Sequence, residues 1–436
     1  MADIIFKKYE FISKNINLYF FFTLLILEFY IFYSFKPDLG GDTKQYLFLS
    51  ENFSSFLYEL FSGNVDLKRF PGYPLFIKSI IYFNQNPNLV FFTQLLIFNL
   101  SIYFLINSID TKNHLFLYVI LLSPITIYSQ KLIYPDGLIF SLLIIIYVNF
   151  LKNNKKLYIL FSFILFLIKA VFWFLIPLIL FKFEKKIYKF FFTLTLCLIS
   201  FLLIYFLSPG KLVDITVERP GYVNEIYNNK YNRELYLDIT VDMENFCNLQ
   251  NSYDFIDKKN KKLNFFESDH KNKNGYSLSS EQIDFVNPII KQCLINNKKK
   301  FQRKIFLLVL KENLYFQSKI LIKTFFHTFS GWNLNDHLSY QMQNNINEFE
   351  KFNEFFSKEI TNKYSKILPL FLLFFLIYLI FQKKINYQNL FSYEFLFLFN
   401  YSFIVTLSAQ HPQDRYMLFN IIMFYFFIKK IQINTN

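Results

Sequence analysis

Residues that build metal cages and nucleotide sites are scarce in this sequence. Its 436 residues include 3 Cys, 5 His and 9 Gly, and no two His lie three or four positions apart. Neither a Gly-rich phosphate loop nor a Gly-x-Ser-x-Gly segment is present. These absences argue against a histidine metal cage, nucleotide-driven transport and serine hydrolysis.

Three cysteines allow at most one disulfide. Cys247 and Cys293 share a long hydrophilic segment, and the sequence leaves open whether they are bridged. Cys197 lies in an apolar segment, where we expect an inert packing residue.

Charge is absent over long stretches of the chain. Hydrophobic residues make up 53% of the sequence and aromatic residues 22%. They recur in apolar blocks of roughly 18 to 20 residues with few charges, each long enough to cross a hydrocarbon core of about 30 Å as a helix. The predicted fold class is therefore an all-α polytopic membrane protein.

The net charge of +14 comes from 46 Lys and Arg against 32 Asp and Glu. In a membrane protein such an excess first reflects topology, because cytoplasmic loops collect basic residues. We therefore expect membrane lipids as partners and no nucleic acid.

The apolar blocks are predicted to form the transmembrane segments. The first is interpreted as a retained helix, because it is too long for a signal peptide and lacks a small-residue cleavage site. The block at 157–181 contains Lys169 and Pro177, which favours two short, tilted or re-entrant segments and gives about ten transmembrane helices in all. The blocks lie at about 16–35, 88–107, 115–133, 136–151, 157–181, 187–207, 367–382, 390–408 and 414–431.

Lysine clusters between the blocks predict the topology, with both termini in the cytoplasm. Two loops then lie outside: residues 36–87, with juxtamembrane helices, and residues 208–366. The expected organisation is an N-terminal transmembrane module (1–207), a large external loop (208–366) and C-terminal transmembrane helices (367–436). The clusters are Lys7, Lys8 and Lys14; Lys112; Lys152, Lys155 and Lys156; Lys182, Lys185, Lys186 and Lys189; Lys383 and Lys384; Lys429 and Lys430.

The large loop ends in segments that mix apolar and charged residues. The segments at 301–329 and 346–364 are predicted to be surface-lying helices. Within the first, Glu312–Ser318 reads ENLYFQS, the recognition sequence of a viral protease widely used to remove tags. No tag flanks it, so we interpret it as a coincidence.

The first outer loop holds four of the nine glycines. Gly40 and Gly41 allow a tight turn that lifts the carboxylate of Asp42 off the end of the first helix. The simpler interpretation is an Asp N-cap for a helix that starts at Thr43. Tyr46 and Tyr73 of the same loop also fit an interfacial aromatic belt.

Arginine is rare, since 41 of the 46 basic residues are Lys. An Arg kept in such a chain points to bidentate binding of phosphate or carboxylate. Arg69, Lys169 and Arg415 all map to the outer membrane boundary in the predicted topology. Lys169 is costly inside an apolar run unless it snorkels to the interface, and Arg415 equally fits pairing with Asp414 or with lipid head groups.

The first outer loop has Asp42, Tyr46 four residues later, and a downstream Arg-x-Pro-Gly-Tyr-Pro-x-Phe segment at 69–76. With these residues it resembles the first external loop of the GT-C glycosyltransferases, the bacterial relatives of protein O-mannosyltransferases and of the aminoarabinose transferase that modifies lipid A. The resemblance covers nearly the whole chain except the middle of residues 208–300. The family commonly has Leu-x-Arg-Pro where this chain has Lys169 and Ala170, which leaves the role of that position open. The matching segments are Asp42 with Tyr46, Arg69-Phe70-Pro71-Gly72-Tyr73-Pro74, Leu122-Ser123-Pro124, Tyr134-Pro135-Asp136, Leu167-Ile168-Lys169-Ala170 and Asp414-Arg415-Tyr416.

This resemblance implies a sugar transfer at the outer face of a bacterial inner membrane. The donor would be a sugar on a polyprenyl phosphate, the acceptor a cell-surface glycan, lipid or protein, and the anomeric carbon would invert. Asp42 would be the catalytic base or position a divalent metal together with Asp136. Asp136 is expected at a sharp external turn, where a purely turn-forming role is as plausible. The lipid phosphate and the substrate would be bound by Arg69, Lys169, Arg415, Tyr46, Tyr73 and Asp136.

Two other classes stay open at this point. An O-antigen-type polymerase or ligase is also polytopic, but it relies on Arg-rich outer loops, and residues 208–366 have few Arg. A flippase or transporter of lipid-linked glycans should show internal repeats and polar residues at mid-membrane.

Overall fold

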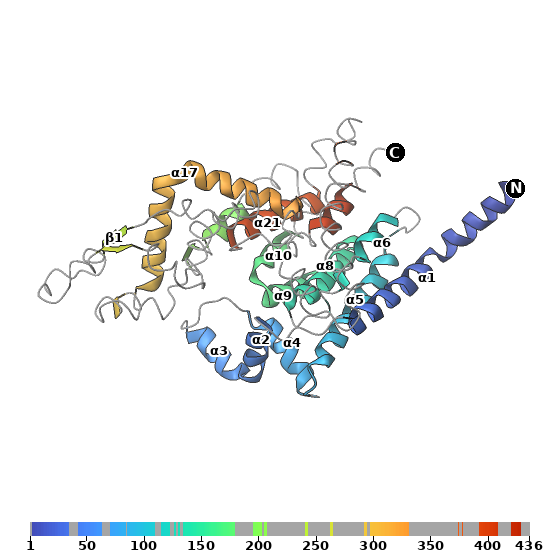
Figure 1. Cartoon of the computed structure of the whole chain (residues 1–436), viewed down its shortest axis with the longest axis horizontal. Helices are drawn as coiled ribbons and strands as arrows, with labels where there is room; N and C mark the ends of the chain where they lie inside the picture. Colours follow the sequence, from blue (N-terminus) through green and yellow to red (C-terminus); the bar gives the residue numbers. More distant parts are fainter. Residues whose placement is uncertain are drawn as a thin grey trace, which may run out of the picture. The chain divides into compact units, whose positions relative to one another are not determined.

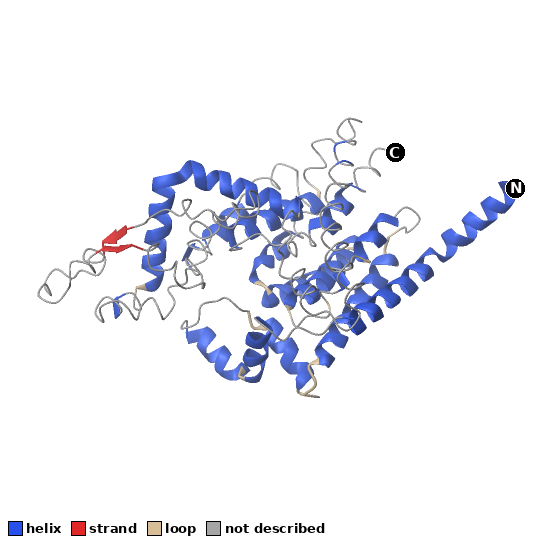
Figure 2. Ribbon diagram, in the orientation of Figure 1, coloured by secondary structure: helices blue, strands red, loops and turns tan. Residues whose placement is uncertain are grey.

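A computed structural model gives the structure, and the residues that it describes are mostly helical (Figures 1 and 2). This agrees with the predicted all-α class, apart from one short pair of strands. The described residues are 2–34, 42–62, 70–83, 85–109, 115–122, 126–127, 130, 134–178, 195–202, 205–206, 240–242, 262–264, 292–293, 297–330, 374, 377, 392–408 and 420–428.

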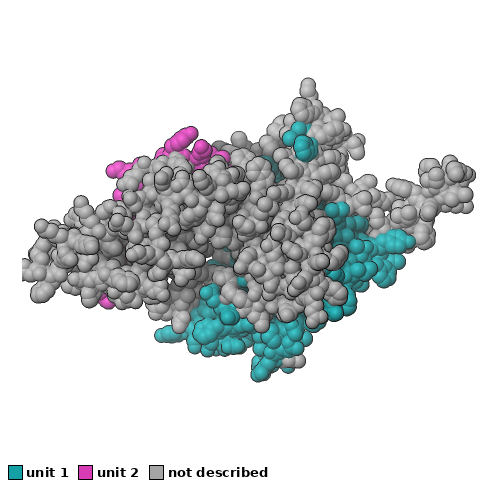
Figure 3. All heavy atoms as spheres, in the orientation of Figure 1, with its two compact units in different colours: residues 1–193, 329–401, 413–436 teal, residues 194–328, 402–412 magenta. Residues whose placement is uncertain are grey.

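The chain divides into two compact units, which are described separately (Figure 3). Unit 1 comprises residues 1–193, 329–401 and 413–436, and unit 2 comprises residues 194–328 and 402–412. The described helices that lie wholly in unit 1 are α1 (Ala2–Ser34), α2 (Asp42–Glu51), α3 (Phe53–Ser62), α4 (Gly72–Ile81), α5 (Asn88–Ile106), α6 (Leu115–Leu121), α8 (Pro135–Leu151), α9 (Lys155–Ile168), the 3₁₀ helix η2 (Ala170–Phe174) and α10 (Leu175–Leu178). Helix α21 (Tyr393–Ser408) begins in unit 1 and ends in unit 2.

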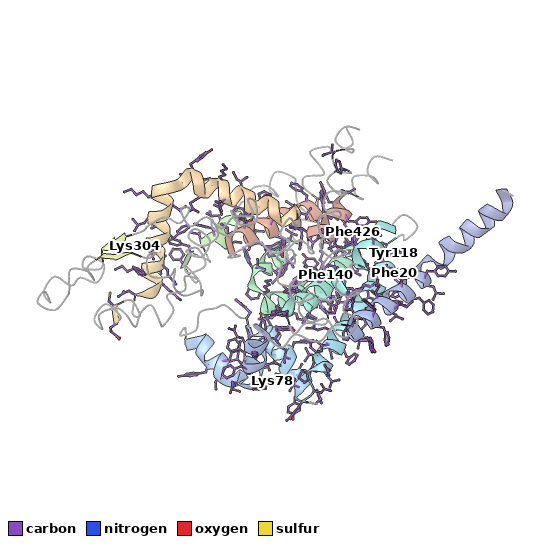
Figure 4. The ribbon with its side chains drawn as sticks, in the orientation of Figure 1. Phe20, Lys78, Tyr118, Phe140, Lys304 and Phe426 are labelled. Atoms are coloured by element: carbon purple, nitrogen blue, oxygen red, sulfur yellow. The ribbon has the colours of Figure 1, made fainter. Side chains whose placement is uncertain are left out.

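Helix α8 forms the core of unit 1. Its sequence is apolar on every side, as expected for a helix that is surrounded by others. It packs against α5 and α9, and the ring of Phe140, labelled in Figure 4, lies 6.2 Å from that of Phe98 in α5. Aromatic contacts extend outward from this core, since Phe20 of α1 stacks on Tyr118 of α6 at 4.3 Å (Figure 4).

One described helix, α5 with 19 residues, is long and apolar enough to cross a membrane. Shorter apolar helical stretches occupy Leu18–Ser34, Gly72–Ile81, Pro135–Leu151 and Tyr393–Leu407. Three of these four lie in blocks predicted to be transmembrane, and Gly72–Ile81 lies in the predicted first outer loop. The total of about ten transmembrane helices therefore stays a prediction.

The predicted block at 115–133 is not one continuous helix. Helix α6 ends at Leu121, and the described residues beyond it include a turn at Leu122 and a short helical piece at 126–127. The sequence offers the reason. Ser123-Pro124 follows Leu122, and a proline disfavours the α-helical conformation of the residue before it.

The chain turns back on itself at Lys169. Helix α9 ends at Ile168, Lys169 is extended (φ −151°, ψ 109°), and η2 begins at Ala170. Tyr158, eleven residues before the break, donates its hydroxyl to the backbone oxygen of Leu175, six residues after it, at 2.8 Å. Two short helical segments therefore lie between 155 and 178, and their insertion in a membrane stays a prediction.

Unit 2 contains all but the last two residues of α17 (Lys298–Ser330) and a strand pair that the sequence did not predict. Strands β1 (Thr240–Asp242) and β2 (Lys262–Asn264) are antiparallel, with Val241 opposite Leu263. Helix α17 confirms that 301–329 is helical. The predicted surface-lying segment at 346–364 lies outside the described residues.

The cysteines of unit 2 differ in chemical state. Cys293 is disulfide-bonded, whereas Cys197 is a buried thiol, as expected for a packing residue. Cys247 lies outside the described residues.

Candidate functional site at the junction of α4, α8 and α9

An ion pair joins the start of α8 to the end of α9. The Nζ atom of Lys169 lies 3.4 Å from Oδ1 of Asp136, whose side chain is 4% exposed against 29% for Lys169. Asp136 occupies the first turn of α8, directly after Pro135 at the first helical position. Proline is well suited to that position, and a carboxylate in the first turn is stabilised by the helix dipole.

Two sequence-based interpretations need correction here. Asp136 lies within α8 and is buried, not in a turn between helices. Lys169 does lie in a break of the apolar run. Its ammonium group is paired with the carboxylate of Asp136, whereas the snorkelling interpretation had it reach the membrane interface. The ion pair has a physical reason, because a buried carboxylate is costly unless an opposite charge or a donor satisfies it.

Gly72 brings α4 against the end of α9. A Cβ atom at this position would lie 2.6 Å from the carbonyl carbon of Leu167 and 2.8 Å from the backbone nitrogen of Ile168. No side chain fits there without moving backbone, so the approach requires glycine. The contact fixes the start of α4 next to the residues that precede Lys169.

Tyr73, the next residue, is fully buried and joins α4 to α5. Its hydroxyl donates to Oε1 of Gln94 at 2.7 Å, and Nε2 of Gln94 donates to the backbone oxygen of Gln130 at 2.9 Å. Tyr46 of α2 meets the Tyr73 ring edge to face at 5.0 Å. Both tyrosines are therefore buried inside the protein and do not belong to an interfacial belt.

The charge of Asp136 affects the pKa of Tyr73. Burial raises the pKa of Tyr73 well above its usual value, and the nearby Tyr46, Asp136 and Tyr134 raise it further. The phenol therefore stays neutral and keeps its proton for the hydrogen bond to Gln94. The ion pair and the tyrosine network thus belong to one site.

Three of the predicted site residues are described only in part or not at all. Asp42 is the first residue of α2, one position earlier than the expected helix start at Thr43, and its side chain lies outside the described part of the structure. Arg69 and Arg415 also lie outside it. Helix α2 packs against α4, so the backbone of Asp42 begins a helix that contributes Tyr46 to the site.

A metal site stays a prediction. Among the described residues there is no group of three or more His, Cys, Asp or Glu able to hold a metal ion. Asp136 contributes one described carboxylate, and Lys169 is its partner. The suggested pairing of Asp42 with Asp136 around a divalent ion depends on an Asp42 side chain that is not described.

Gln94 is the site residue that the sequence analysis missed. It lies in α5, the most regular apolar helix, and is fully buried. Gln94 carries no charge, so it does not interrupt the apolar block in which it lies. Its amide still needs hydrogen-bond partners inside an otherwise apolar helix, and this need could have identified it.

A second buried polar cluster lies at the other end of α8. Tyr147 donates to Oε1 of Glu394 in α21 at 3.0 Å, and the hydroxyls of Tyr158 and Tyr393 lie 3.1 Å apart. The Tyr147 ring also lies 4.4 Å from that of Phe426, labelled in Figure 4. This cluster ties α8, α9 and the start of α21 together and was not predicted.

The junction can do limited but definite chemistry. It has a cation, Lys169, with part of its surface accessible, and a buried carboxylate that fixes this cation in place. It also has a rigid aromatic wall made by Tyr46 and Tyr73. Comparison of the chain with protein-family models, with curated proteins and with solved structures finds no match.

Proposed function

We propose that this chain is an integral membrane glycosyltransferase of the GT-C type, which moves a sugar from a polyprenyl-phosphate carrier to a cell-surface glycan, lipid or protein. One observation carries the proposal. Tyr46, Tyr73, Asp136 and Lys169 were selected from four separate sequence segments, and they meet at one junction. Gly72 of the same motif makes the close approach that this junction needs.

The proposed reaction assigns a role to each charged group. An acceptor hydroxyl or amine attacks the anomeric carbon and gives its proton to the carboxylate of Asp42, while the bond from that carbon to the lipid phosphate breaks. Lys169, with Arg69 and Arg415, stabilises the negative charge on the departing phosphate. Asp136 holds the Lys169 ammonium in position, and a divalent metal at Asp42 and Asp136 would supply further positive charge.

The proposed location is a bacterial inner membrane with about ten transmembrane helices and the site at the outer face. The reversal at Lys169 supports this topology. Because Tyr158 bonds to Leu175, the chain after the break runs back alongside α9. A chain that continued in this direction would bring the lysine cluster after the hairpin to the same side of the membrane as the cluster before it, as the proposed topology requires.

A buried polar pair favours a second candidate, a flippase or transporter of lipid-linked glycans. Nδ2 of Asn99 in α5 donates to Oε2 of the buried Glu28 in α1 at 3.2 Å. Transporters carry such polar groups within their apolar helices. An O-antigen-type polymerase or ligase has no comparable support, because residues 208–366 contain few Arg.

The test is transfer by purified protein in lipid nanodiscs. Release of polyprenyl phosphate is measured from a panel of polyprenyl-phosphate sugars, with native membranes as the source of acceptor. We expect Asp42→Asn to abolish release without loss of folded protein, because an amide does not accept the proton of the acceptor. The amide still caps a helix about as well, so a capping role alone would leave the activity unchanged.

The assay also includes a control variant and a measurement that tests the transporter alternative. Ser79→Ala, on the exposed side of α4, should transfer normally. Near wild-type transfer by folded Asp42→Asn protein would remove Asp42 from the mechanism. Movement of a labelled lipid-linked sugar between leaflets of vesicles, without cleavage, would favour the transporter.

A further inference from the structure

Helix α17 presents one face to its surroundings. The exposed α17 face is defined by Leu307, Lys311, Leu314, Tyr315, Lys319 and Ile322. Apart from the neighbours Leu314 and Tyr315, these positions follow one another at intervals of three and four residues, the spacing of one side of a helix, and α17 bends along its length (Figure 1). Exposure of its apolar members is high, at 62% for Leu314 and 83% for Tyr315.

The opposite side of the same helix is already occupied. Phe306, Gln317 and Ile320 are all buried within the protein. The exposed α17 face is therefore a second apolar surface on a helix whose first apolar surface is satisfied. Large apolar side chains left exposed together mark an interaction site.

The charge of α17 selects the kind of partner. Its one acidic residue is Glu312, whereas basic residues recur along its length. Lysines whose stems lie among exposed apolar side chains can reach the phosphates of anionic lipids at a membrane surface. The basic residues are Lys298, Lys299, Lys300, Arg303, Lys304, Lys311, Lys319 and Lys323, with Lys304 labelled in Figure 4.

The contacts of α17 within unit 2 indicate the same kind of partner, a membrane surface. Phe306 packs against Phe201 and Tyr205, and the guanidinium carbon of Arg303 lies 5.8 Å and 5.7 Å from the ring centroids of Tyr205 and Phe206. These three aromatic residues form the end of the apolar block at 187–207, which is predicted to be transmembrane. Helix α17 is thus packed on a segment that the sequence predicts to end at a membrane boundary.

We propose that the exposed α17 face lies in the surface of a bilayer that contains anionic phospholipids. Leu307, Leu314 and Ile322 enter the boundary between headgroups and acyl chains, and Tyr315 takes the interfacial position that its amphipathic ring favours. Lys311 and Lys319 contact lipid phosphates. This proposal depends on the chain being embedded in a membrane, not on its catalytic activity.

The experiment measures the depth of a nitroxide attached to Leu314→Cys in the full chain. The protein is reconstituted into nanodiscs of phosphatidylcholine alone or with phosphatidylglycerol, and accessibility to oxygen is compared with accessibility to a water-soluble nickel complex. Lys156→Cys, an exposed position at the start of α9, is the aqueous control. The parent protein gives the background labelling, which the buried Cys197 should keep low.

We expect the nitroxide at 314 to lose nickel accessibility and gain oxygen accessibility in the phosphatidylglycerol discs, unlike the control. The double substitution Lys311→Glu and Lys319→Glu, or high salt, should reverse that shift, because both remove the attraction to anionic lipid. A water-exposed label in both kinds of disc overturns the proposal, as does equal immersion with and without phosphatidylglycerol. A label shielded from both reagents also overturns it, since that result means contact with protein.

Discussion

Asp136 and Lys169 depend on each other at the level of single residues. Asp136 is buried, so removal of its cation leaves a charge without its compensation in a medium of low dielectric constant. Lys169 is partly exposed, so its own loss of hydration is smaller. The pair therefore stabilises the junction mainly by satisfying the aspartate.

We expect Lys169→Ala to lower the free energy of unfolding by roughly 1–3 kcal/mol, as for a buried polar group that loses its partner. Asp136→Asn combined with Lys169→Ala should restore part of this loss, because the buried group is then neutral. Thermal unfolding in detergent of the two single variants and the double variant measures this coupling. Lys156→Ala is the control, and additive losses in the double variant would contradict a direct pair.

Gly72→Ala tests the approach of α4 to α9. The added methyl group would lie 2.6 Å from the carbonyl carbon of Leu167, so backbone must shift. Overpacking of this kind costs typically 1–3 kcal/mol, and Ser79→Ala on the exposed side of α4 should cost little. Thermal unfolding of both variants checks the prediction, and equal stability would mean that α4 moves freely from α9.

At the scale of elements, α17 contains a sequence that makes its folding easy to test. Glu312–Ser318 matches the recognition sequence of a viral protease, yet the scissile bond between Gln317 and Ser318 lies inside α17, and Gln317 is buried. Proteolysis requires local unfolding, and a packed helix opens rarely.

We therefore expect the folded protein to resist this protease over hours. The same heptapeptide added as a flexible C-terminal extension should be cut rapidly and serves as the internal control. Ile320→Pro should make the internal site cleavable, because proline breaks the helix interior at a cost of about 3 kcal/mol. Gel electrophoresis distinguishes the products, and rapid internal cleavage of the wild-type protein would mean that α17 is not stably folded.

At the scale of the whole molecule, the proposed topology places residues 208–366 outside the cell membrane and residues 152–156 inside. A Cys at Lys299, which is exposed on α17, should react with an impermeant thiol reagent in intact spheroplasts. A Cys at Lys155, exposed at the start of α9, should react only after the membrane is permeabilised. The reverse pattern would invert the topology, and the site would then face nucleotide-sugar donors rather than lipid-linked ones.

The sequence by itself determined the helical class and many of the helix positions. Local rules suffice for this, because an apolar run such as the one that forms α5 satisfies its backbone groups within the helix. The break at Lys169 was also visible, since a charge divides that run. Strands β1 and β2 were not visible, because three residues carry too little pattern to distinguish a strand from a loop.

The tertiary structure alone decided which polar residues meet. Lys169 pairs with Asp136 across 33 positions of sequence, and Tyr73 bonds to Gln94 across 21. Neither partner follows from spacing, because each contact depends on how α4, α5, α8 and α9 pack, and on the missing side chain at Gly72 that lets two backbones touch. The sequence named the residues that carry charge, and packing determined which of those charges is buried and with what partner.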